Sequence, residues 1–186
     1  MKVILASKSP RRLELLTLLG YEVETVVSDV DEDKISAETP ELLALELSKA
    51  KATAVFEASN HVSLPIVAAD TLVCVDNEIL GKPKDRRDAE RMLRLLSGKT
   101  HQVHTGYTVI YGGKTLSYCD SSDVIFRDIT EDELRDYIDS MEPYDKAGAY
   151  GIQGKAGAFV ERIEGDFFSI MGLPISKISK ILNDFK

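Results

Sequence analysis

Alternating and clustered apolar residues predict most of the strands. Short apolar runs at 3–6 and 66–69 predict buried strands, and an alternating run at 21–27 predicts another. Two longer runs, around 101–111 and 114–127, flank Gly112-Gly113, a dipeptide typical of a hairpin turn. Leu72–Val75 continues the 66–69 strand or forms its hairpin partner. Runs at 159–163 and 166–170, on either side of Glu164-Gly165, predict two further short strands.

Apolar residues at helical spacing follow recognisable helix starts. Ser9-Pro10 reads as an N-cap with proline at the first helical position, followed by spaced leucines and a stop at Gly20. Further helices are predicted from Thr39-Pro40 to about Ala58, after Asp85, after Thr130 and from Pro174. The segments 28–39 and 145–157 are expected to be irregular. Helices mixed with hairpin-connected strands predict an α/β fold with a mixed sheet, not a regular doubly wound one.

Length and composition indicate an ordinary globular chain. At 186 residues it is expected to form one domain, 1–186. Hydrophobic residues make up 44% and charged residues 29%, which argues against a disordered chain or a fibre. No run approaches the roughly 20 apolar residues of a membrane helix, and the first residues do not form a secretory signal. We therefore expect a cytoplasmic protein that does not bind membranes.

Net charge and cysteine content exclude other classes. With 23 basic and 31 acidic residues the formal charge is −8, which disfavours nucleic acid as a partner because such binding neutralises phosphates. A small anionic substrate remains compatible, since it needs only a local basic cluster. Cys74 and Cys119 form no CxxC pair, so a disulfide framework or a zinc site is not expected. Cys74 is expected to be a buried strand residue.

The segment Ser7-Lys8-Ser9-Pro10-Arg11-Arg12 is a candidate anion site. It lies where a strand meets the N-terminus of a helix, and free backbone N–H groups there favour an anion. Two arginines and two serines add donors suited to phosphate. The alternative is ordinary capping with solvated arginines, although two arginines oppose the helix dipole at this end.

Asp70-Thr71 follows the apolar run 66–69 directly. A carboxylate at the end of a buried strand opens onto the crevice where α/β folds bind ligands, and it can hold a metal or activate a water. The alternative is a turn residue that closes a hairpin, and position alone leaves both open. The acidic run Asp29–Asp33, which includes Glu32, suits Mg²⁺ but is more often a solvated loop.

Two lysines are weaker candidates. Lys82, between Gly81 and Pro83, lies on a constrained turn and is either a phosphate ligand or a surface residue. Lys51 and Lys49 share one helix, and one of them is expected to face inward. The histidines His61, His101 and His104 fall outside all candidate segments, so we interpret them as structural or surface residues.

The segment 145–154 is rich in glycine and alanine around Tyr150 and Gln153. Small residues allow a backbone to approach a ligand closely, and the Gln153 amide can read the edge of a base. Tight structural turns explain the glycines equally well. The pattern is neither a P-loop nor a G-x-G-x-x-G fingerprint.

Taken together, five segments resemble the Maf family of nucleoside triphosphate pyrophosphatases over essentially the whole chain. They are 5–12, 69–71, 81–83, 145–154 and 172–174. The resemblance implies an α/β fold with a mixed twisted sheet flanked by helices, and two lobes with a deep active-site cleft, often in a homodimer. It implies hydrolysis between the α- and β-phosphates with a divalent cation, Mg²⁺ or Mn²⁺. The subgroup whose loop matches 145–154 prefers dTTP and UTP, whereas a sister subgroup acts on 7-methyl-GTP.

The resemblance also implies roles for single residues. Asp70 matches the proton acceptor of the family, and Arg11, Thr71 and Gln153 match its specificity positions. Glu32, Lys51 and Lys82 match further charged positions of the cleft. We expect Asp70 and Glu32 to hold the metal, and the phosphates and base to be bound by Ser7, Ser9, Arg11, Arg12, Lys51, Thr71, Lys82 and Gln153.

Two other functions compete with dTTP and UTP hydrolysis. A non-catalytic nucleotide- or nucleic-acid-binding regulator of cell division would use the same arginines, but carboxylates near the phosphates would not help it. A pyrophosphatase for 5-modified pyrimidine nucleotides is the second, because a pocket that admits the thymine methyl does not exclude similar substituents.

Overall fold

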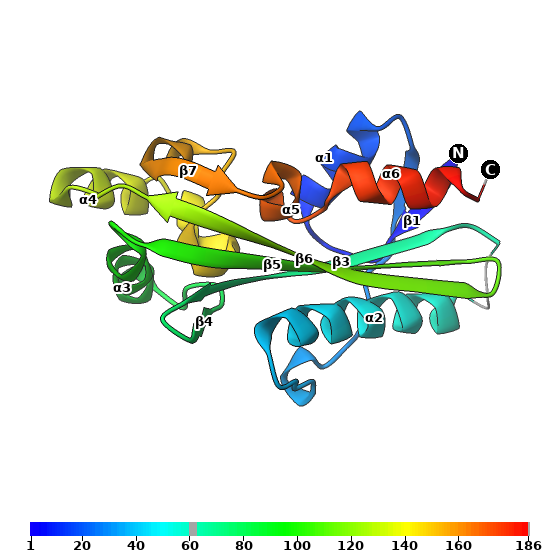
Figure 1. The fold of residues 1–186 in the computed structure, drawn as a ribbon. Coiled ribbons are helices and arrows are strands. Elements are labelled where there is room, and N and C mark those ends of the chain that lie inside the picture. Colours follow the sequence, from blue (N-terminus) through cyan, green and yellow to red (C-terminus); the bar gives the residue numbers. More distant parts are fainter. Residues whose placement is uncertain (60–62, 186) are drawn as a thin grey trace. The chain divides into compact units, whose positions relative to one another are not determined.

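The protein folds around one mixed β-sheet. The structure is a computed structural model that describes residues 1–59 and 63–185. Its strands are β1 (Lys2–Leu5), β2 (Glu22–Thr25), β3 (Ile66–Val75), β4 (Glu78–Leu80), β5 (Thr100–Tyr111), β6 (Lys114–Phe126) and β7 (Val160–Glu164). Within the described residues these seven strands are ordered β2-β1-β3-β5-β6-β7, with β4 paired to β3 (Figure 1). Strand β1 is parallel to β2 and β3, whereas β3–β4 and β6–β7 are antiparallel, which confirms the mixed sheet.

The helices begin close to the predicted caps. They are α1 (Pro10–Leu18), α2 (Pro40–Ala58), α3 (Arg86–Leu96), α4 (Glu131–Asp139), α5 (Phe167–Met171) and α6 (Ile175–Asn183), with 3-10 turns η1 (Glu32–Lys34), η2 (Glu142–Asp145), η3 (Ala147–Ala149) and η4 (Lys155–Phe159). Thr39 and Asp85 each accept a hydrogen bond from a first-turn N–H, and Thr130 with Glu133 forms a complete capping box. Among the described helices, none has the length and hydrophobicity to cross a membrane.

Two local predictions are wrong. Of the two alternatives for Leu72–Val75, continuation of the 66–69 strand is confirmed, and the hairpin partner is β4; the placement of Asp70 at the end of a strand is therefore wrong. The run 166–170 is not a strand but contributes most of helix α5. The Asp166 carboxylate accepts hydrogen bonds from the N–H groups of Phe168 and Ser169 at 2.8 and 3.3 Å, which starts a helical turn. A short apolar run does not distinguish a strand from a buried helix segment.

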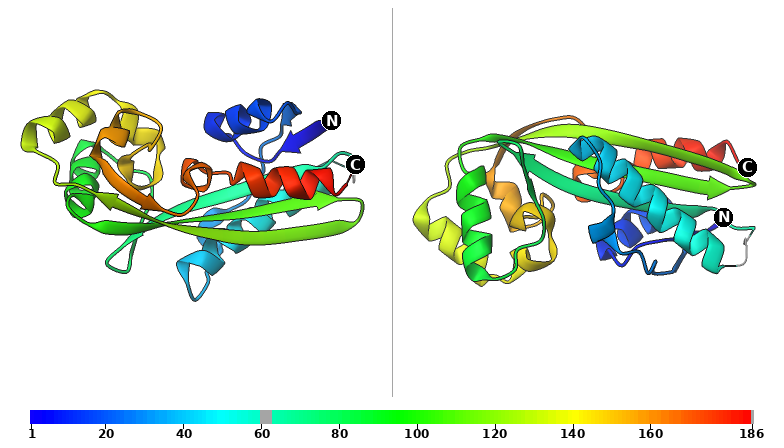
Figure 2. Two further views of the ribbon diagram at one scale, coloured as in Figure 1. Left: turned by 45° about the horizontal axis from the view of Figure 1, so that its top comes forward. Right: turned by 90° about the horizontal axis from the view of Figure 1, so that it is seen from below.

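The chain divides into two compact units. Unit 1 comprises Met1–Asp70, Thr105–Asp120 and Gly172–Lys186. Within it, helix α2 covers one face of the strands and helices α1 and α6 lie on the other, as the turned views also show (Figure 2). Gly106 of β5 lets the α2 backbone come close, since a Cβ there would lie 2.1 Å from the Ala44 carbonyl oxygen. Its hairpin turn has the predicted Gly112-Gly113, with φ of 58° and 75°.

Unit 2 comprises Thr71–His104 and Ser121–Met171. Its core gathers residues of the strands, of α3 and α4 and of the segment 147–159, and Phe126 and Tyr137 are among them. Helix α3 packs against α4 and against η3. Much of the segment 142–159 is 3-10 turns with no long helix or strand, which agrees with its glycine content. The strands β3, β5 and β6 run through both units.

Candidate active site

The N-terminus of α1 has the predicted N-cap residue, Ser9, with Pro10 at the start of the helix, but the cap lacks a side-chain hydrogen bond. Ser9 precedes Pro10 in extended backbone, and its side chain makes no capping hydrogen bond. Its N–H donates to the Ser7 hydroxyl at 3.2 Å. The first turn of α1 contains no acidic residue. The positive end of this helix is therefore flanked by Arg11 and Arg12 without a carboxylate in the same turn.

Arg12 is held by two partners within unit 1. Its Nε donates to the carbonyl oxygen of Gly172 at 2.9 Å, and a terminal nitrogen donates to the Ser7 hydroxyl at 3.0 Å. Burial lowers the pKa of the guanidinium, the charges of Asp70 and Glu32 oppose this, and Arg11 adds to it. The Arg12 side chain thus joins α1 to the segment that precedes α6. The charges of Asp70 and Glu32 both act on its guanidinium.

Asp70, Lys51 and Glu32 form the central charge cluster of unit 1. Asp70 is buried in the middle of β3, and Lys51 reaches it from α2 with 2.5 Å between Nζ and Oδ1. The same ammonium lies 2.9 Å from Oε1 of Glu32 in η1. The side chains of Asp70 and Lys51 are each 12% exposed, while that of Glu32 is 54% exposed. The inward lysine of α2 is therefore Lys51, whereas Lys49 pairs with Glu46 at the surface.

This cluster fits a cation site that substrate would complete. The carboxylates of Glu32 and Asp70 both contact the Lys51 ammonium, so they lie near one another. Carboxylate oxygens suit Mg²⁺, which proteins often bind through one or two carboxylates plus substrate phosphates. Across the described residues, no group of three or more His, Cys, Asp or Glu side chains could hold a metal. The two carboxylates are compatible with a metal that also binds phosphates.

Lys82 and Gln153 belong to unit 2. The Gly148 N–H donates to the Gly81 carbonyl at 3.0 Å, so the segments 81–83 and 145–154 are neighbours. Gly148 has φ of +67°, and a Cβ there would lie 2.9 Å from Val73, so glycine is required. Lys82 and Gln153 are both exposed. Thr71 follows Asp70 in β3 and is partly buried.

Two residues that sequence analysis missed hold the Gln153 segment. The Glu142 carboxylate accepts the Lys155 N–H at 3.2 Å, and the Tyr137 hydroxyl accepts the Gly151 N–H at 3.3 Å. Glu142 lies outside the segment 145–154, and a glutamate three residues upstream has no distinctive pattern. Only the folded backbone brings it to Gly154.

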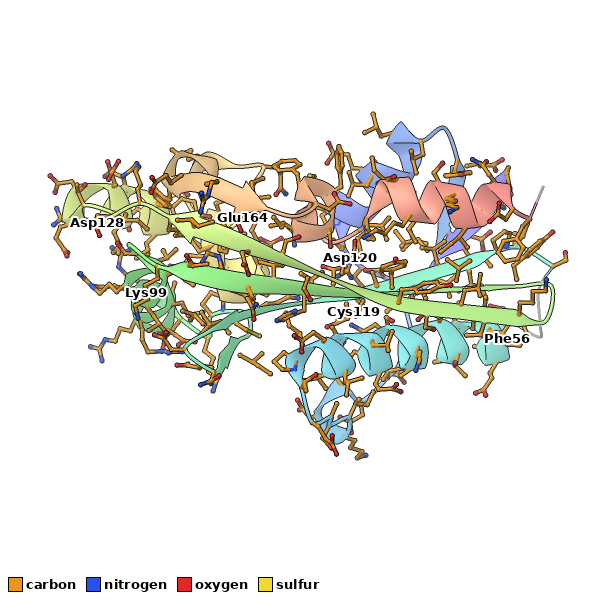
Figure 3. All side chains as sticks on the ribbon, viewed as in Figure 1. Phe56, Lys99, Cys119, Asp120, Asp128 and Glu164 are labelled. Atoms are coloured by element: carbon orange, nitrogen blue, oxygen red, sulfur yellow. The ribbon has the colours of Figure 1, made fainter. Side chains whose placement is uncertain are left out.

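Among the described residues, the histidines and cysteines are not part of these clusters. His101 is buried on β5 and shares a 2.8 Å hydrogen bond with Tyr150, and burial lowers its pKa to about 4. His104 is buried on β5 beside Ser121, which agrees with a structural role, and His61 lies outside the described residues. Cys74 is buried on β3 as predicted. Cys119 lies on β6 next to Asp120 (Figure 3), and its pKa is raised to about 11 by burial.

Comparison with known proteins places these features in a family. The sequence model described as Maf-like protein matches residues 2–185. The chain belongs to the Maf family. Maf relatives named dTTP/UTP pyrophosphatase occur in Bacillus mycoides, 47% identical over 99% of this chain and 95% of the relative, and in Bacillus anthracis, 46% identical with the same coverage.

A solved structure supports the fold of this Maf chain. The structure of the Staphylococcus aureus Ham1 protein covers 100% of both chains with a TM-score of 0.53 and 14% sequence identity. At that identity the likeness concerns the mixed α/β architecture alone.

Proposed function

We propose that this protein is a nucleoside triphosphate pyrophosphatase that hydrolyses dTTP and UTP to the monophosphate and pyrophosphate. Full-length relatives at 46–47% identity that are named dTTP/UTP pyrophosphatase support the substrate class. The observation that carries the proposal is the buried Asp70 carboxylate, paired with Lys51 at 2.5 Å beside Glu32. A protein that only bound phosphate would gain nothing from two carboxylates in the same cluster, because they repel the ligand.

Asp70 is assigned as the general base. Lys51 contacts Oδ1 and orients the carboxylate, which leaves Oδ2 as the oxygen we assign to the attacking water. Oδ2 accepts a proton from this water as its oxygen attacks the α-phosphorus in line with the leaving pyrophosphate. Glu32 and Asp70 are the residues that would hold the divalent cation, Mg²⁺ or Mn²⁺. When bound, that cation supplies electrostatic stabilisation of the charge on the phosphate oxygens.

Basic and hydroxyl side chains are assigned to the phosphates. Arg11 and Arg12 flank the N-terminus of α1, and Ser7 and Ser9 lie in the turn before it. Guanidinium groups and hydroxyls donate to phosphate oxygens there, where the helix end also favours an anion. Lys51 and Lys82 add positive charge, which stabilises the leaving pyrophosphate.

Thr71 and Gln153 are assigned to the pyrimidine base. The Gln153 amide offers one acceptor and two donors, which suit the O4, N3–H and O2 groups of uracil and thymine. Cytosine is rejected because its 4-amino group would meet a donor. A pocket that accepts the thymine methyl also accepts 5-modified uridine nucleotides of similar size, and we include these as substrates.

The surroundings of the enzyme are part of the proposal. We place it in the cytoplasm, where nucleotides are available and where the thiols of Cys74 and Cys119, which form no disulfide, stay reduced. The whole chain, 1–186, acts as one Maf-like domain, and we propose a homodimer. Nucleic acid and membranes are not partners, in keeping with the net charge of −8.

The test is pyrophosphate release from a nucleotide panel with Mg²⁺ or Mn²⁺. Wild type is expected to hydrolyse dTTP and UTP, and Asp70→Asn to lose about 10³-fold in kcat, the usual range for a general base. Asp120→Asn is the matched control, because Asp120 is also a strand carboxylate, 10% exposed and paired with a lysine, Lys177. It should stay within about twofold of wild type. Turnover in a folded Asp70→Asn that equals wild type would reject the base assignment.

The same panel tests the regulatory alternative. A non-catalytic regulator of cell division would bind nucleotides without releasing pyrophosphate under any cation condition. Binding without turnover in the wild type would therefore replace the enzymatic proposal with that alternative.

A further inference from the structure

Gln153 is exposed, so packing of its own side chain does not determine where the amide points. Its position depends on the backbone on both sides, from Gly151 to Lys155. This stretch contains one internal turn, in which the Gly154 N–H donates to the Gly151 carbonyl at 3.0 Å. Ile152 within the stretch is buried in the core of unit 2, and hydrogen bonds from outside the stretch hold the backbone on either side of Gln153.

Glu142 supplies the anchor after Gln153. One carboxylate oxygen, Oε2, accepts the Lys155 N–H at 3.2 Å. A Cβ at position 154 would lie 2.0 Å from the other oxygen, Oε1. Gly154 therefore leaves room for the Glu142 carboxylate. The carboxylate therefore lies directly against the backbone that follows Gln153.

Tyr137 of α4 supplies the anchor before Gln153. Its hydroxyl accepts the Gly151 N–H at 3.3 Å and donates to Oε1 of Glu142 at 3.3 Å. Burial raises the pKa of this hydroxyl, and the Glu142 charge adds to the effect, so it remains a donor. The two anchors are thus connected to each other through one hydrogen bond.

Glu142 is itself held in place by its neighbours. Its carbonyl oxygen accepts from Nζ of Lys146 at 2.6 Å, and its N–H donates to the Ser140 hydroxyl at 3.4 Å. Met141 before it has φ of 63°, in the left-handed region, which turns the chain from α4 into η2. The left-handed backbone at Met141 is strained, and this turn places Glu142 opposite Gly154.

We propose that Glu142 and Tyr137 are positioning residues that set the direction of Gln153 and thereby the choice of base. This inference rests on the proposed function, in which Gln153 reads the pyrimidine edge. Neither residue needs to touch the nucleotide. Loss of either anchor leaves Ile152 packed in the core but loosens the backbone next to Gln153. Gln153 then samples directions in which it no longer distinguishes the 4-oxo group of uracil from the 4-amino group of cytosine.

The experiment compares kcat/KM for UTP and CTP in Glu142→Ala, Glu142→Gln and Tyr137→Phe. We expect the UTP preference to fall about tenfold in Glu142→Ala, the value of one lost hydrogen bond, through a higher KM for UTP with kcat nearly unchanged. Tyr137→Phe should lose less. Glu142→Gln keeps one oxygen acceptor and should partly restore the preference.

Glu133→Gln is the matched control. Glu133 is also a carboxylate of unit 2 that accepts a backbone N–H, from Thr130, but it caps α4 and pairs with Arg127. The control should lower stability and leave the UTP preference unchanged. An unchanged preference in folded Glu142→Ala and Tyr137→Phe would overturn the proposal, as would an equal loss in Glu133→Gln.

Failure of the proposed function gives a different result. If the wild type releases no pyrophosphate, the ratio of UTP to CTP dissociation constants is measured by calorimetry on the same variants. A ratio that falls in Glu142→Ala still supports the positioning role. A wild type that distinguishes UTP from CTP in neither turnover nor binding overturns it.

Discussion

The two candidate regions are built by different means. In unit 1, charged side chains project from regular elements, and the Lys51 ammonium joins Asp70 of β3 to Glu32 of η1. In unit 2, the Gln153 segment is irregular, and hydrogen bonds to its backbone N–H groups from Glu142 and Tyr137 hold it. Charges on a rigid framework suit chemistry that needs fixed distances, whereas an anchored loop suits recognition. Changes in unit 1 should therefore affect rate, and changes in the loop should affect selectivity.

Of the substitutions that test this comparison, Lys51→Met should have the largest effect on activity. It removes the one ammonium that contacts both carboxylates and leaves the buried Asp70 without this partner. We expect kcat/KM for UTP to fall about 10³-fold, as for loss of a preorganised charge, with the UTP preference over CTP unchanged. Steady-state kinetics check this, with Lys49→Met as the control on the same helix. A changed preference with little loss of rate would break the division of roles.

Gly106→Ala should come next. A Cβ at this position would lie 2.1 Å from the Ala44 carbonyl oxygen and 2.5 Å from the Leu45 nitrogen, so the backbone of α2 must move. We expect the free energy of unfolding to fall by about 3 kcal/mol, as for an overpacked core. Activity should fall as well, because α2 carries Lys51. Urea denaturation measures the loss, and Gly81→Ala, where a Cβ meets open space, should change stability little.

Acid should weaken unit 2 through His101. Burial lowers the pKa of His101 to about 4, below the 6.5 of an unfolded histidine. Between these values the unfolded chain binds a proton that the native state does not, so stability falls as pH falls. At pH 5 this costs about 2 kcal/mol relative to neutral pH. His101→Gln should flatten the dependence of the unfolding free energy on pH in this window. If the slope stays unchanged, the pH dependence comes from other groups.

Gly154→Ala should have the smallest effect on stability, about 1 kcal/mol. The added Cβ would come closest to the end of the Glu142 side chain, which can turn away. The UTP preference over CTP should nonetheless fall severalfold, since the anchor after Gln153 is displaced. A variant that loses rate and keeps its preference would show that the loop serves catalysis instead.

Local signals in the sequence accounted for much of the fold. Caps at Thr39, Asp85 and Thr130 and the turn at Gly112-Gly113 were predictable because each depends on contacts within a few residues. The strand predicted at 166–170 failed because the Asp166 carboxylate starts a helix that an apolar run does not reveal. Asp70 was found for its residue type, but it lies in the middle of β3 and not at a strand end.

By itself the sequence determined the Maf family, the α/β class and the residue types that could act on a nucleotide. Only the tertiary structure decided which of them meet. It selected Lys51 over Lys49 as the partner of Asp70, and it joined Arg12 to the Gly172 carbonyl, 160 positions away. It also brought Glu142 to the backbone of Gly154. These contacts depend on how helices and turns pack, and packing geometry is not written in any local pattern of residues.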